Sequence, residues 1–381
     1  MARFTEKGSV EDYILTELQK KGWSFVPAIE LDRDSYDEPL LVRNLIRKVR
    51  DVNETALTDD DINNVLKNLK FKACTQEGVK AILNYLKEGV SIKLEKERVI
   101  ERVRLFDFED IKNNEFIITR QAHYVNGELH KILDIVLYVN GIPLVNIECK
   151  NPASFSEDWT NAYNDIKAYE EAIPELYKYI QIGAAVAETA RYFPIVPWQK
   201  EDIRTEEWKT DDTKNPLDAL LQMLAGETLL DIIRNFIFYR IEFGKATKVI
   251  TRYMQYRAVN RIFRRVIDNL EGKNEKKKGL IWHWQGSGKT LEMIFAAYKL
   301  YHHRSLENPS VFLIVDRTEL EEQLGREFNA LDITKPDVIS SIHGLRQVLK
   351  HDGYKGKRGI MMTLIHKFRP EELAEVDREM K

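Results

Sequence analysis

The sequence predicts an α/β protein with two domains, and three observations carry this prediction. The chain has 381 residues, which suits two or three domains of roughly 100–200 residues each. A helical N-terminal stretch gives way to a strand-rich block between residues 96 and 150. Strand–loop–helix units then alternate in the last third, which is typical of a parallel sheet covered by helices. We place the domains at residues 1–245 and 246–381.

Composition excludes several classes of protein. Lys and Arg total 58 and Asp and Glu total 61, a net charge of −3, which excludes a wholly basic nucleic-acid coat but permits a local basic groove. Only Cys74 and Cys149 occur, so neither a disulfide framework nor a cysteine zinc site organises the fold. The N-terminus is polar, and no apolar run reaches the roughly 20 residues that span a bilayer. We therefore expect a cytoplasmic protein that does not associate with membranes.

Hydrophobic periodicity places the elements of the first domain. Apolar residues recur at helical spacing in four early segments, residues 10–21, 40–52, 59–69 and 76–87. Runs of β-branched and aromatic residues predict strands at 102–106, 116–119, 134–139 and 142–150. The domain is completed by a helix over 159–179, a buried strand over 179–186 and a helix over 217–239.

The second domain begins with a predicted helix over 249–270, which is followed by a lysine-rich loop. Strands are predicted at 279–284, 311–315 and 359–363, with a helix over 291–303. The loop lysines are either a solvated surface or a contact for nucleic acid, and both alternatives stay open: Lys273, Lys276, Lys277 and Lys278.

A glycine-rich segment stands between the predicted strand at 279–284 and the helix after it. Its sequence is Gly286-Ser287-Gly288-Lys289-Thr290, although His283 stands where the eight-residue phosphate-loop pattern has glycine. The glycines let backbone N–H groups turn toward phosphate, Lys289 would contact the β- and γ-phosphates, and Thr290 would bind Mg²⁺. The alternative is a glycine-rich turn with a surface lysine. The sequence supports ATP binding better than ATP hydrolysis. Hydrolysis needs a second carboxylate at a strand end to hold Mg²⁺, and no strand ending in Asp-Glu follows in this sequence.

A second pattern unites two acids and a lysine on one predicted hairpin. Asp134 opens a strand, Asn140-Gly141 is a strong hairpin signal, and the return strand ends with Glu148 and Lys150, which share a face. Paired carboxylates bind Mg²⁺, and a nearby ammonium stabilises phosphoryl charge. The alternative is a surface salt bridge on an ordinary hairpin. The apolar strand around these charges favours the functional interpretation, because burying a charge costs free energy unless a partner or a ligand compensates it.

Register provides a test of this hairpin. A two-residue Asn140-Gly141 loop in regular pairing would set Asp134 opposite Ile147 and turn Glu148 to the other face. We therefore predict either a loop of three or five residues or a β-bulge, each of which shifts the register by one.

The two patterns together resemble the R (HsdR) subunit of type I restriction enzymes, over almost the whole chain. Residues 133–137, 140–144 and 148–152 are similar to the nuclease core of that family, which is of the PD-(D/E)xK type. Residues 283–290 resemble helicase motif I of the family, 315–320 motif Ia, and 360–363 together with 367–368 motif Ib. The resemblance implies a restriction-endonuclease-like mixed sheet flanked by helices, followed by part of a P-loop RecA-like lobe.

The resemblance also implies roles for the residues of the hairpin. Asp134 and Glu148 would bind Mg²⁺ with help from the Cys149 carbonyl, and Lys150 would assist catalysis. Glu11 on the first helix would supply an accessory carboxylate; the alternative is an ordinary acid at a helix N-terminus.

Two further residues carry implied roles outside the hairpin. Tyr169 matches a Gln-x-x-x-Tyr motif on the helix that follows the nuclease core, although Asp165 stands where many family members have Gln. Gln255, within residues 253–257, matches a Q-motif and would contact adenine; the alternative is a helical surface glutamine.

The function implied is ATP-driven translocation of double-stranded DNA followed by Mg²⁺-dependent cleavage. Methyltransferase (M) and specificity (S) subunits would be the partners. The resemblance further implies that this chain is the N-terminal part of a longer subunit, without its acidic Walker B box and second motor lobe. Two alternatives stay open: another nuclease–helicase fusion, and a non-catalytic nucleotide-binding scaffold.

Overall fold

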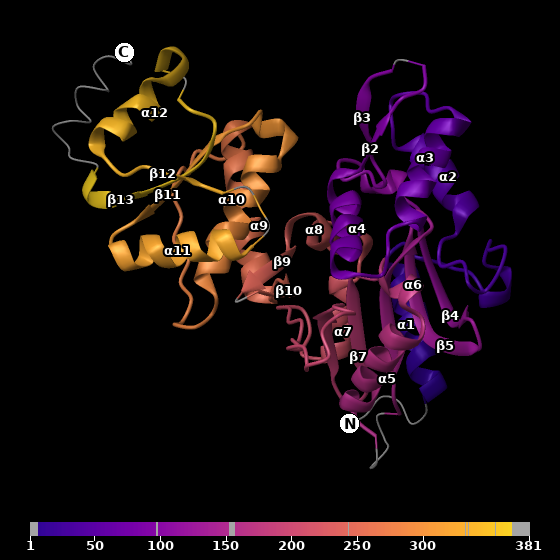
Figure 1. The fold of residues 1–381 in the computed structure, drawn as a ribbon. Helices are drawn as coiled ribbons and strands as arrows, with labels where there is room; N and C mark the ends of the chain where they lie inside the picture. The colour runs from indigo at the N-terminus through magenta and orange to yellow at the C-terminus, as the bar shows by residue number, and fades with distance from the viewer. Residues whose placement is uncertain are drawn as a thin grey trace. The chain divides into compact units, whose positions relative to one another are not determined.

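The computed structural model describes residues 7–96, 98–151, 157–242, 244–331, 333, 335–354 and 356–367. The chain divides into two compact units, Met1–Ile237 and Phe238–Lys381, and each is described by itself (Figure 1). The predicted domain boundary, between residues 245 and 246, lies a few residues further along. Among the described residues, no helix combines the length and apolarity that a membrane span requires.

A six-stranded mixed sheet forms the centre of the first unit, as predicted. Its strands run in the order β1 (Ser24–Phe25), β4 (Phe116–Asn126), β5 (Leu129–Val139), β6 (Ile142–Cys149), β7 (Ile182–Val186) and β8 (Ala190–Pro194). β1 is parallel to β4 and β6 is parallel to β7, while the other neighbours are antiparallel. Every residue of β6 and β7 is buried, which is expected where both faces of a sheet are covered.

Helices pack against this sheet, and a separate small hairpin completes the unit. α1 (Lys7–Lys20) contacts β1, β4 and β6, and α5 (Trp159–Ala172) contacts β5, β6 and β7. The remaining helices are α2 (Val42–Asp51), α3 (Asp59–Lys70), α4 (Gln76–Glu88), α6 (Pro174–Tyr177), α7 (Pro216–Met223) and α8 (Gly226–Asn235). A small hairpin pairs β2 (Val90–Lys93) with β3 (Ile100–Val103). Short 3₁₀ turns occur at Ala28–Glu30 and Ile111–Asn113 in this unit, and at Arg304–Leu306 and Ile365–Lys367 in the second unit.

Two predicted helices of the first unit are wrong in extent. The helix expected over 159–179 ends at Ala172, because Pro174 has no N–H to continue it and begins α6 instead. The helix expected over 217–239 is two helices followed by strand β9 (Ile237–Glu242). Its last residues are β-branched and aromatic and pair with β10 (Lys245–Ile250), so strand pairing overrides helical periodicity there.

The second unit contains parallel strands that alternate with helices. Three strands lie in the order β11 (Ser310–Val315), β13 (Gly359–Leu364), β12 (Asp337–Val338), and both pairings are parallel. The helices are α9 (Tyr253–Leu270), α10 (Lys289–His302), α11 (Thr318–Ala330) and α12 (Ile342–Tyr354). This confirms the predicted parallel α/β pattern for the described part of the unit.

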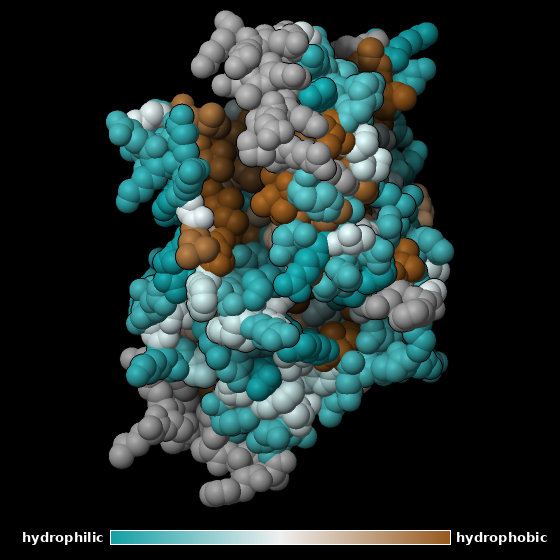
Figure 2. All heavy atoms as spheres, turned by 90° about the vertical axis from the view of Figure 1, so that its left-hand side faces the viewer, coloured by the Kyte–Doolittle hydropathy of each residue, from teal (hydrophilic) through white to brown (hydrophobic). Residues whose placement is uncertain are grey.

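The strand predicted at 279–284 is not formed, and the prediction was therefore wrong. No described strand pairs with the segment, and a strand without a hydrogen-bonded neighbour has no ladder to stabilise it. Leu280 and Trp282 are 86% and 87% exposed. Figure 2 shows hydrophobic side chains gathered on the face of the molecule turned to the viewer, among hydrophilic ones.

Candidate functional site

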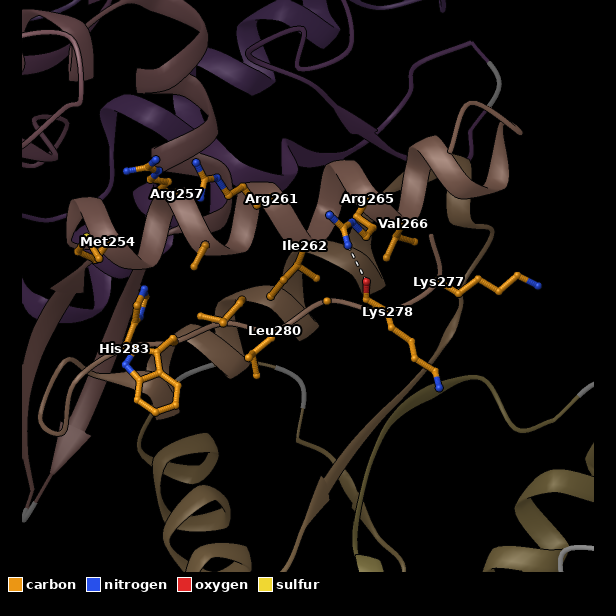
Figure 3. A pocket seen from close by; sticks show the side chains of 14 residues that line it. Met254, Arg257, Arg261, Ile262, Arg265, Val266, Lys277, Lys278, Leu280 and His283 are labelled. Atoms are coloured by element: carbon orange, nitrogen blue, oxygen red, sulfur yellow. Dashed lines mark hydrogen bonds between the residues drawn. The ribbon is translucent and has the colours of Figure 1, made fainter. Parts of the chain in front are cut away.

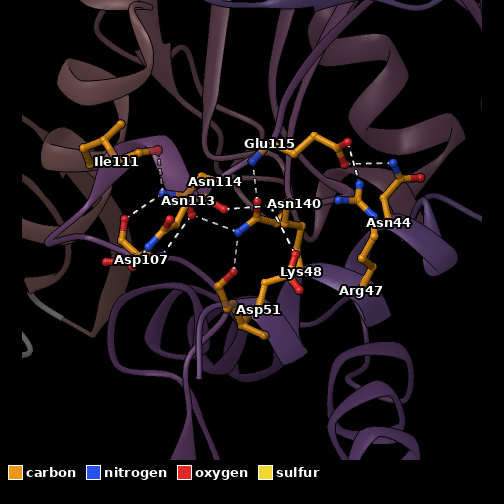
Figure 4. A network of polar contacts seen from close by, with 11 residues as sticks. Asn44, Arg47, Lys48, Asp51, Asp107, Ile111, Asn113, Asn114, Glu115 and Asn140 are labelled. Carbon is orange, nitrogen blue, oxygen red and sulfur yellow. Dashed lines mark hydrogen bonds and ion pairs between the residues drawn. The ribbon is translucent and has the colours of Figure 1, made fainter. Parts of the chain in front are cut away.

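The turn between β5 and β6 is buried inside the first unit. Asn140 and Gly141 have φ of +50° and +80°, as a two-residue hairpin turn requires. The Asn140 amide nitrogen donates to the Leu105 carbonyl (2.8 Å) and to Asn114 Oδ1 (2.9 Å), while its oxygen accepts from the Glu115 N–H (2.8 Å) (Figure 4). This network fixes the hairpin at its closed end.

The register of the hairpin contains the shift that the sequence predicted. Val139 pairs with Ile142 next to the turn, whereas Ile135 pairs with Ile147, and the irregularity lies between Leu137 and Tyr138. The loop has two residues and a β-bulge supplies the extra one, so the bulge alternative is confirmed. As a result, the side chains of the two predicted acids share one face of the sheet.

The two acids are buried and are bonded to each other's strand. Asp134 is 4% exposed and Glu148 is 2% exposed. Glu148 Oε1 accepts from the Asp134 N–H (3.1 Å), and Asp134 Oδ2 accepts from the Cys149 N–H (2.9 Å). Two buried carboxylates side by side are costly unless donors or a cation satisfy them. The geometry is therefore that of a prepared anionic site.

A third predicted acid reaches the same place from α1. Glu11 is 5% exposed, and the side-chain amide of Gln121 links it to the hairpin. Gln121 Nε2 lies 3.3 and 3.2 Å from the two carboxylate oxygens of Glu11 and 3.3 Å from Asp134 Oδ1. The structure thus links Glu11, through Gln121, to the hairpin that carries Asp134 and Glu148, and the sequence analysis missed Gln121. Gln121 lies just beyond the strand predicted at 116–119, and no sequence pattern indicates such a role for it.

The predicted lysine and tyrosine lie next to these acids. Lys150 follows β6 and its Nζ pairs with Asp165 Oδ2 of α5 at 2.6 Å. Burial raises the pKa of Tyr169, and the negative charges of Glu148, Asp165 and Asp134 raise it further. Tyr169 is therefore a neutral phenol at physiological pH. Asp165, at the position where many members of the resembling family have Gln, holds the lysine ammonium.

The donor set suits a hard divalent cation. Within the ranges that the structure describes, no three or more His, Cys, Asp or Glu side chains are grouped as a preformed metal cage. Mg²⁺ is ordinarily held by only one or two carboxylates and keeps several waters, so Asp134 and Glu148 satisfy its usual requirement. Zinc would require a denser set of nitrogen or sulfur ligands.

The glycine-rich loop of the second unit has the backbone of a phosphate cradle. Gly286 and Gly288 have φ of +82° and +87°, and α10 begins at Lys289, with Thr290 as its second residue. Lys289 Nζ donates to the carbonyls of His283 (2.9 Å) and Trp284 (3.1 Å). Ser287 is 5% exposed and its hydroxyl has no hydrogen-bond partner among the described residues. A buried polar atom without a partner costs stability, so the loop is suited to receive a ligand.

Gln255 contacts this loop from α9. It is 2% exposed, so the alternative of a surface glutamine is wrong. Its Oε1 accepts from the Arg252 N–H (2.9 Å) and its Nε2 donates to the Gly288 carbonyl (3.1 Å). The contact with adenine stays a prediction.

A groove of about 720 Å³ lies beside the loop, between α9 and residues 277–283. Arg257, Arg261 and Arg265 of α9 line it, together with Lys277 and Lys278. Arg265 Nη1 donates to the Lys278 carbonyl (2.6 Å), which closes one end (Figure 3). The groove also exposes apolar residues, so both alternatives for the lysine-rich loop remain open.

Comparison with known proteins identifies relatives of both units. Residues 3–202 match the family model described as type I restriction enzyme R protein N terminus, and residues 254–381 match the SWI2/SNF2 ATPase model. The MjaVIIIP endonuclease subunit of Methanocaldococcus jannaschii, named as a type I restriction enzyme subunit, is 31% identical over 96% of this chain and 37% of its own length. The HindI endonuclease subunit of Haemophilus influenzae, also named as type I, is 32% identical over 95% of this chain and 36% of its own length. The chain spans little more than a third of these relatives.

Proposed function

The chain belongs to the type I restriction enzyme R protein N-terminus family, and from this we propose that it carries the nuclease domain and part of the first motor lobe of an R subunit. The activity proposed is Mg²⁺-dependent cleavage of double-stranded DNA, coupled to ATP-driven translocation by the assembled enzyme. The observation that carries the proposal is the bulged β5–β6 hairpin, which sets Asp134 against Glu148, with Lys150 as the residue that follows β6.

The acids of the hairpin would hold the cation. Asp134, Glu148 and the Cys149 carbonyl are the proposed ligands, and Glu11 is the accessory carboxylate. When bound, Mg²⁺ supplies charge that stabilises the phosphorane and lowers the pKa of a coordinated water. The backbone N–H groups that bond both carboxylates fix their orientation before any ligand arrives, which is the preorganisation that electrostatic catalysis needs.

Lys150 and Tyr169 would act on the DNA phosphate. Lys150 places a positive charge beside the acids, and its ion pair with Asp165 aims the ammonium. Tyr169 is a neutral phenol because its pKa is raised, so it donates a hydrogen bond rather than adding a fourth negative charge. Both side chains therefore stabilise an anionic substrate in a site that is otherwise acidic.

The loop in the second unit would bind ATP. Backbone N–H groups of residues 286–290 and the N-terminus of α10 favour phosphate. Lys289 would exchange the carbonyls of His283 and Trp284 for the β- and γ-phosphates. Gln255 holds the Gly288 carbonyl and is proposed to contact the adenine. The SWI2/SNF2 ATPase match supports a motor role for this unit.

The partners proposed are double-stranded DNA and the M and S subunits of a cytoplasmic restriction complex. The relatives support this proposal because they are named as endonuclease subunits of type I restriction enzymes. Target recognition would then belong to another subunit, which agrees with the net charge of −3 in this chain.

The test is cleavage by the full-length R subunit assembled with M and S, with ATP and Mg²⁺ at saturation. Lys150→Ala is expected to lower the cleavage rate about 100-fold or more, since it removes a charge that stabilises the transition state. Lys93→Ala is the control, because Lys93 is an exposed lysine of β2. Cleavage by Lys150→Ala at the wild-type rate would refute the nuclease assignment.

A further inference from the structure

Gln121 has a backbone conformation that its position in a strand does not explain. It lies within β4 with φ +51°, a left-handed conformation that residues other than Gly, Asn and Asp seldom adopt. Arg120 pairs with Ile135 and Ala122 pairs with Leu133, so Gln121 is the residue opposite Asp134. Unusual backbone conformations that survive folding often mark functional positions. The surroundings of the Gln121 side chain supply such a role.

The conformation aims the Gln121 amide between two acids from different elements. Nε2 lies 3.2 and 3.3 Å from the carboxylate oxygens of Glu11 on α1, and 3.3 Å from Asp134 Oδ1 on β5. A glutamine amide has two N–H donors, so one nitrogen serves both carboxylates. Without that donor, the two buried negative charges would repel each other and their side chains would separate.

We propose that Gln121 is a positioning residue of the cleavage site, one that sets Glu11 against Asp134 so that the pair receives a divalent cation. The inference rests on the proposed nuclease function. Gln121 acts through the two acids and touches neither DNA nor the scissile phosphate in this role. Its amide ties the accessory acid on α1 to the hairpin on which the other two acids lie. Removing such a partner of a metal ligand typically weakens metal binding 10–100-fold.

Gln121→Gly separates this role from a purely structural one. Glycine adopts a left-handed conformation without strain, so the variant keeps the backbone conformation and loses the side chain with its amide. If Gln121 were a structural turn residue, the substitution would leave both the fold and the cation site intact. A positioning residue would leave a stable protein with a weaker cation site.

The experiment titrates Mn²⁺ calorimetrically into the full-length R subunit, with Asp134→Asn identifying the signal of this site. Gln121→Gly is expected to bind Mn²⁺ about tenfold more weakly, with a thermal unfolding midpoint equal to or above that of wild type. Arg98→Gly is the matched control: Arg98 also has a left-handed φ of +55° but lies in the β2–β3 turn, so its substitution should leave Mn²⁺ binding unchanged.

Unchanged or tighter Mn²⁺ binding by Gln121→Gly overturns the inference, and so does the lack of an Asp134-dependent signal in wild type. Failure of the nuclease proposal has a different signature. In that case wild type binds Mn²⁺ and Gln121→Gly weakens it, while Lys150→Ala cleaves DNA as well as wild type does.

Discussion

At the scale of single residues, the ion pair that Lys150 forms is central to the candidate cleavage site. Lys150 is bonded to Asp165 rather than to the two acids of the hairpin. Its side chain is 16% exposed and that of Asp165 is 38% exposed, so the pair is partly screened by solvent. Asp165 therefore holds the ammonium in place without neutralising it fully, which leaves Lys150 available to a phosphate.

Asp165→Ala is expected to reduce cleavage about threefold to tenfold, far less than Lys150→Ala. The reason is that a partly exposed ion pair contributes roughly 1 kcal/mol or less, and the lysine itself remains. Asp165→Gln should cleave nearly as well as wild type, because an amide oxygen also accepts from an ammonium. The measurement is the single-turnover cleavage rate in the assembled complex. A loss as large as that of Lys150→Ala would show that Asp165 contacts the reacting groups itself.

Asp107 gives a prediction about acid stability at the same scale. Burial alone would raise its pKa, but hydrogen bonds from the Asn113 side chain and from the N–H groups of Asp110 and Glu109, with the charge of Arg104, hold it below the usual value. A carboxyl whose pKa is lowered on folding stabilises the fold above its unfolded pKa of about 3.9. That stabilisation is lost as the pH falls through the folded pKa.

Asp107→Asn should therefore lower the free energy of unfolding at pH 7 and weaken its decline as the pH falls below about 4. Urea unfolding of wild type and variant across that range measures both effects. Equal pH dependence in the two proteins would contradict the assignment.

At the scale of elements, the β5–β6 hairpin positions the site, and its turn is held inside the molecule. A side chain at Gly141 would place Cβ 2.4 Å from the Leu41 carbonyl oxygen and 2.9 Å from the Leu45 nitrogen. Both atoms belong to backbone at the start of α2, which cannot move without disturbing that helix. The closed end of the hairpin is thus packed tightly against the start of α2.

Gly141→Ala should destabilise the first unit by more than about 2 kcal/mol, because the clash adds to the cost of a left-handed alanine. Gly127→Ala is the matched control, since Gly127 has φ +61° and an added Cβ there would meet nothing within 4 Å. It should cost only about 1–2 kcal/mol, which is the penalty of the conformation alone. Equal losses of unfolding free energy in the two variants would show that the contact with α2 is unimportant.

The sequence predicted the geometry of this hairpin more accurately than it predicted some other elements of the chain. Strand periodicity, the Asn140-Gly141 signal and the requirement that two acids share a face predicted a shift of register, either by a longer loop or by a bulge, and the structure has the bulge. The predictions of a helix at 217–239 and a strand at 279–284 were wrong because strand formation depends on a pairing partner. The end of the first segment forms strand β9, which pairs with β10, whereas no described strand pairs with the second segment. Gln121 was missed because nothing in the local sequence indicates its left-handed conformation, φ +51°.

At the scale of the whole molecule, the two candidate sites belong to separate units. The acids and Lys150 lie in residues 1–237, and the glycine-rich loop lies in residues 238–381. Within the proposed function, ATP binding and divalent-cation binding are therefore separable by mutation. Each site has one lysine whose removal is expected to affect its own ligand.

Lys289→Ala is expected to weaken ATP binding at least about tenfold in the full-length R subunit, because the ammonium that would contact the β- and γ-phosphates is lost. The variant should also stop ATP-dependent cleavage in the assembled complex while leaving Mn²⁺ binding at the Asp134 site unchanged. Lys150→Ala should instead keep ATP affinity at the wild-type value while lowering the cleavage rate about 100-fold or more. On both variants, titration with a fluorescent ATP analogue measures ATP affinity and Mn²⁺ calorimetry measures cation binding at the Asp134 site. ATP affinity unchanged in Lys289→Ala would rule out residues 286–290 as the phosphate cradle, whereas a loss of ATP binding in Lys150→Ala would show that the two sites are not separable.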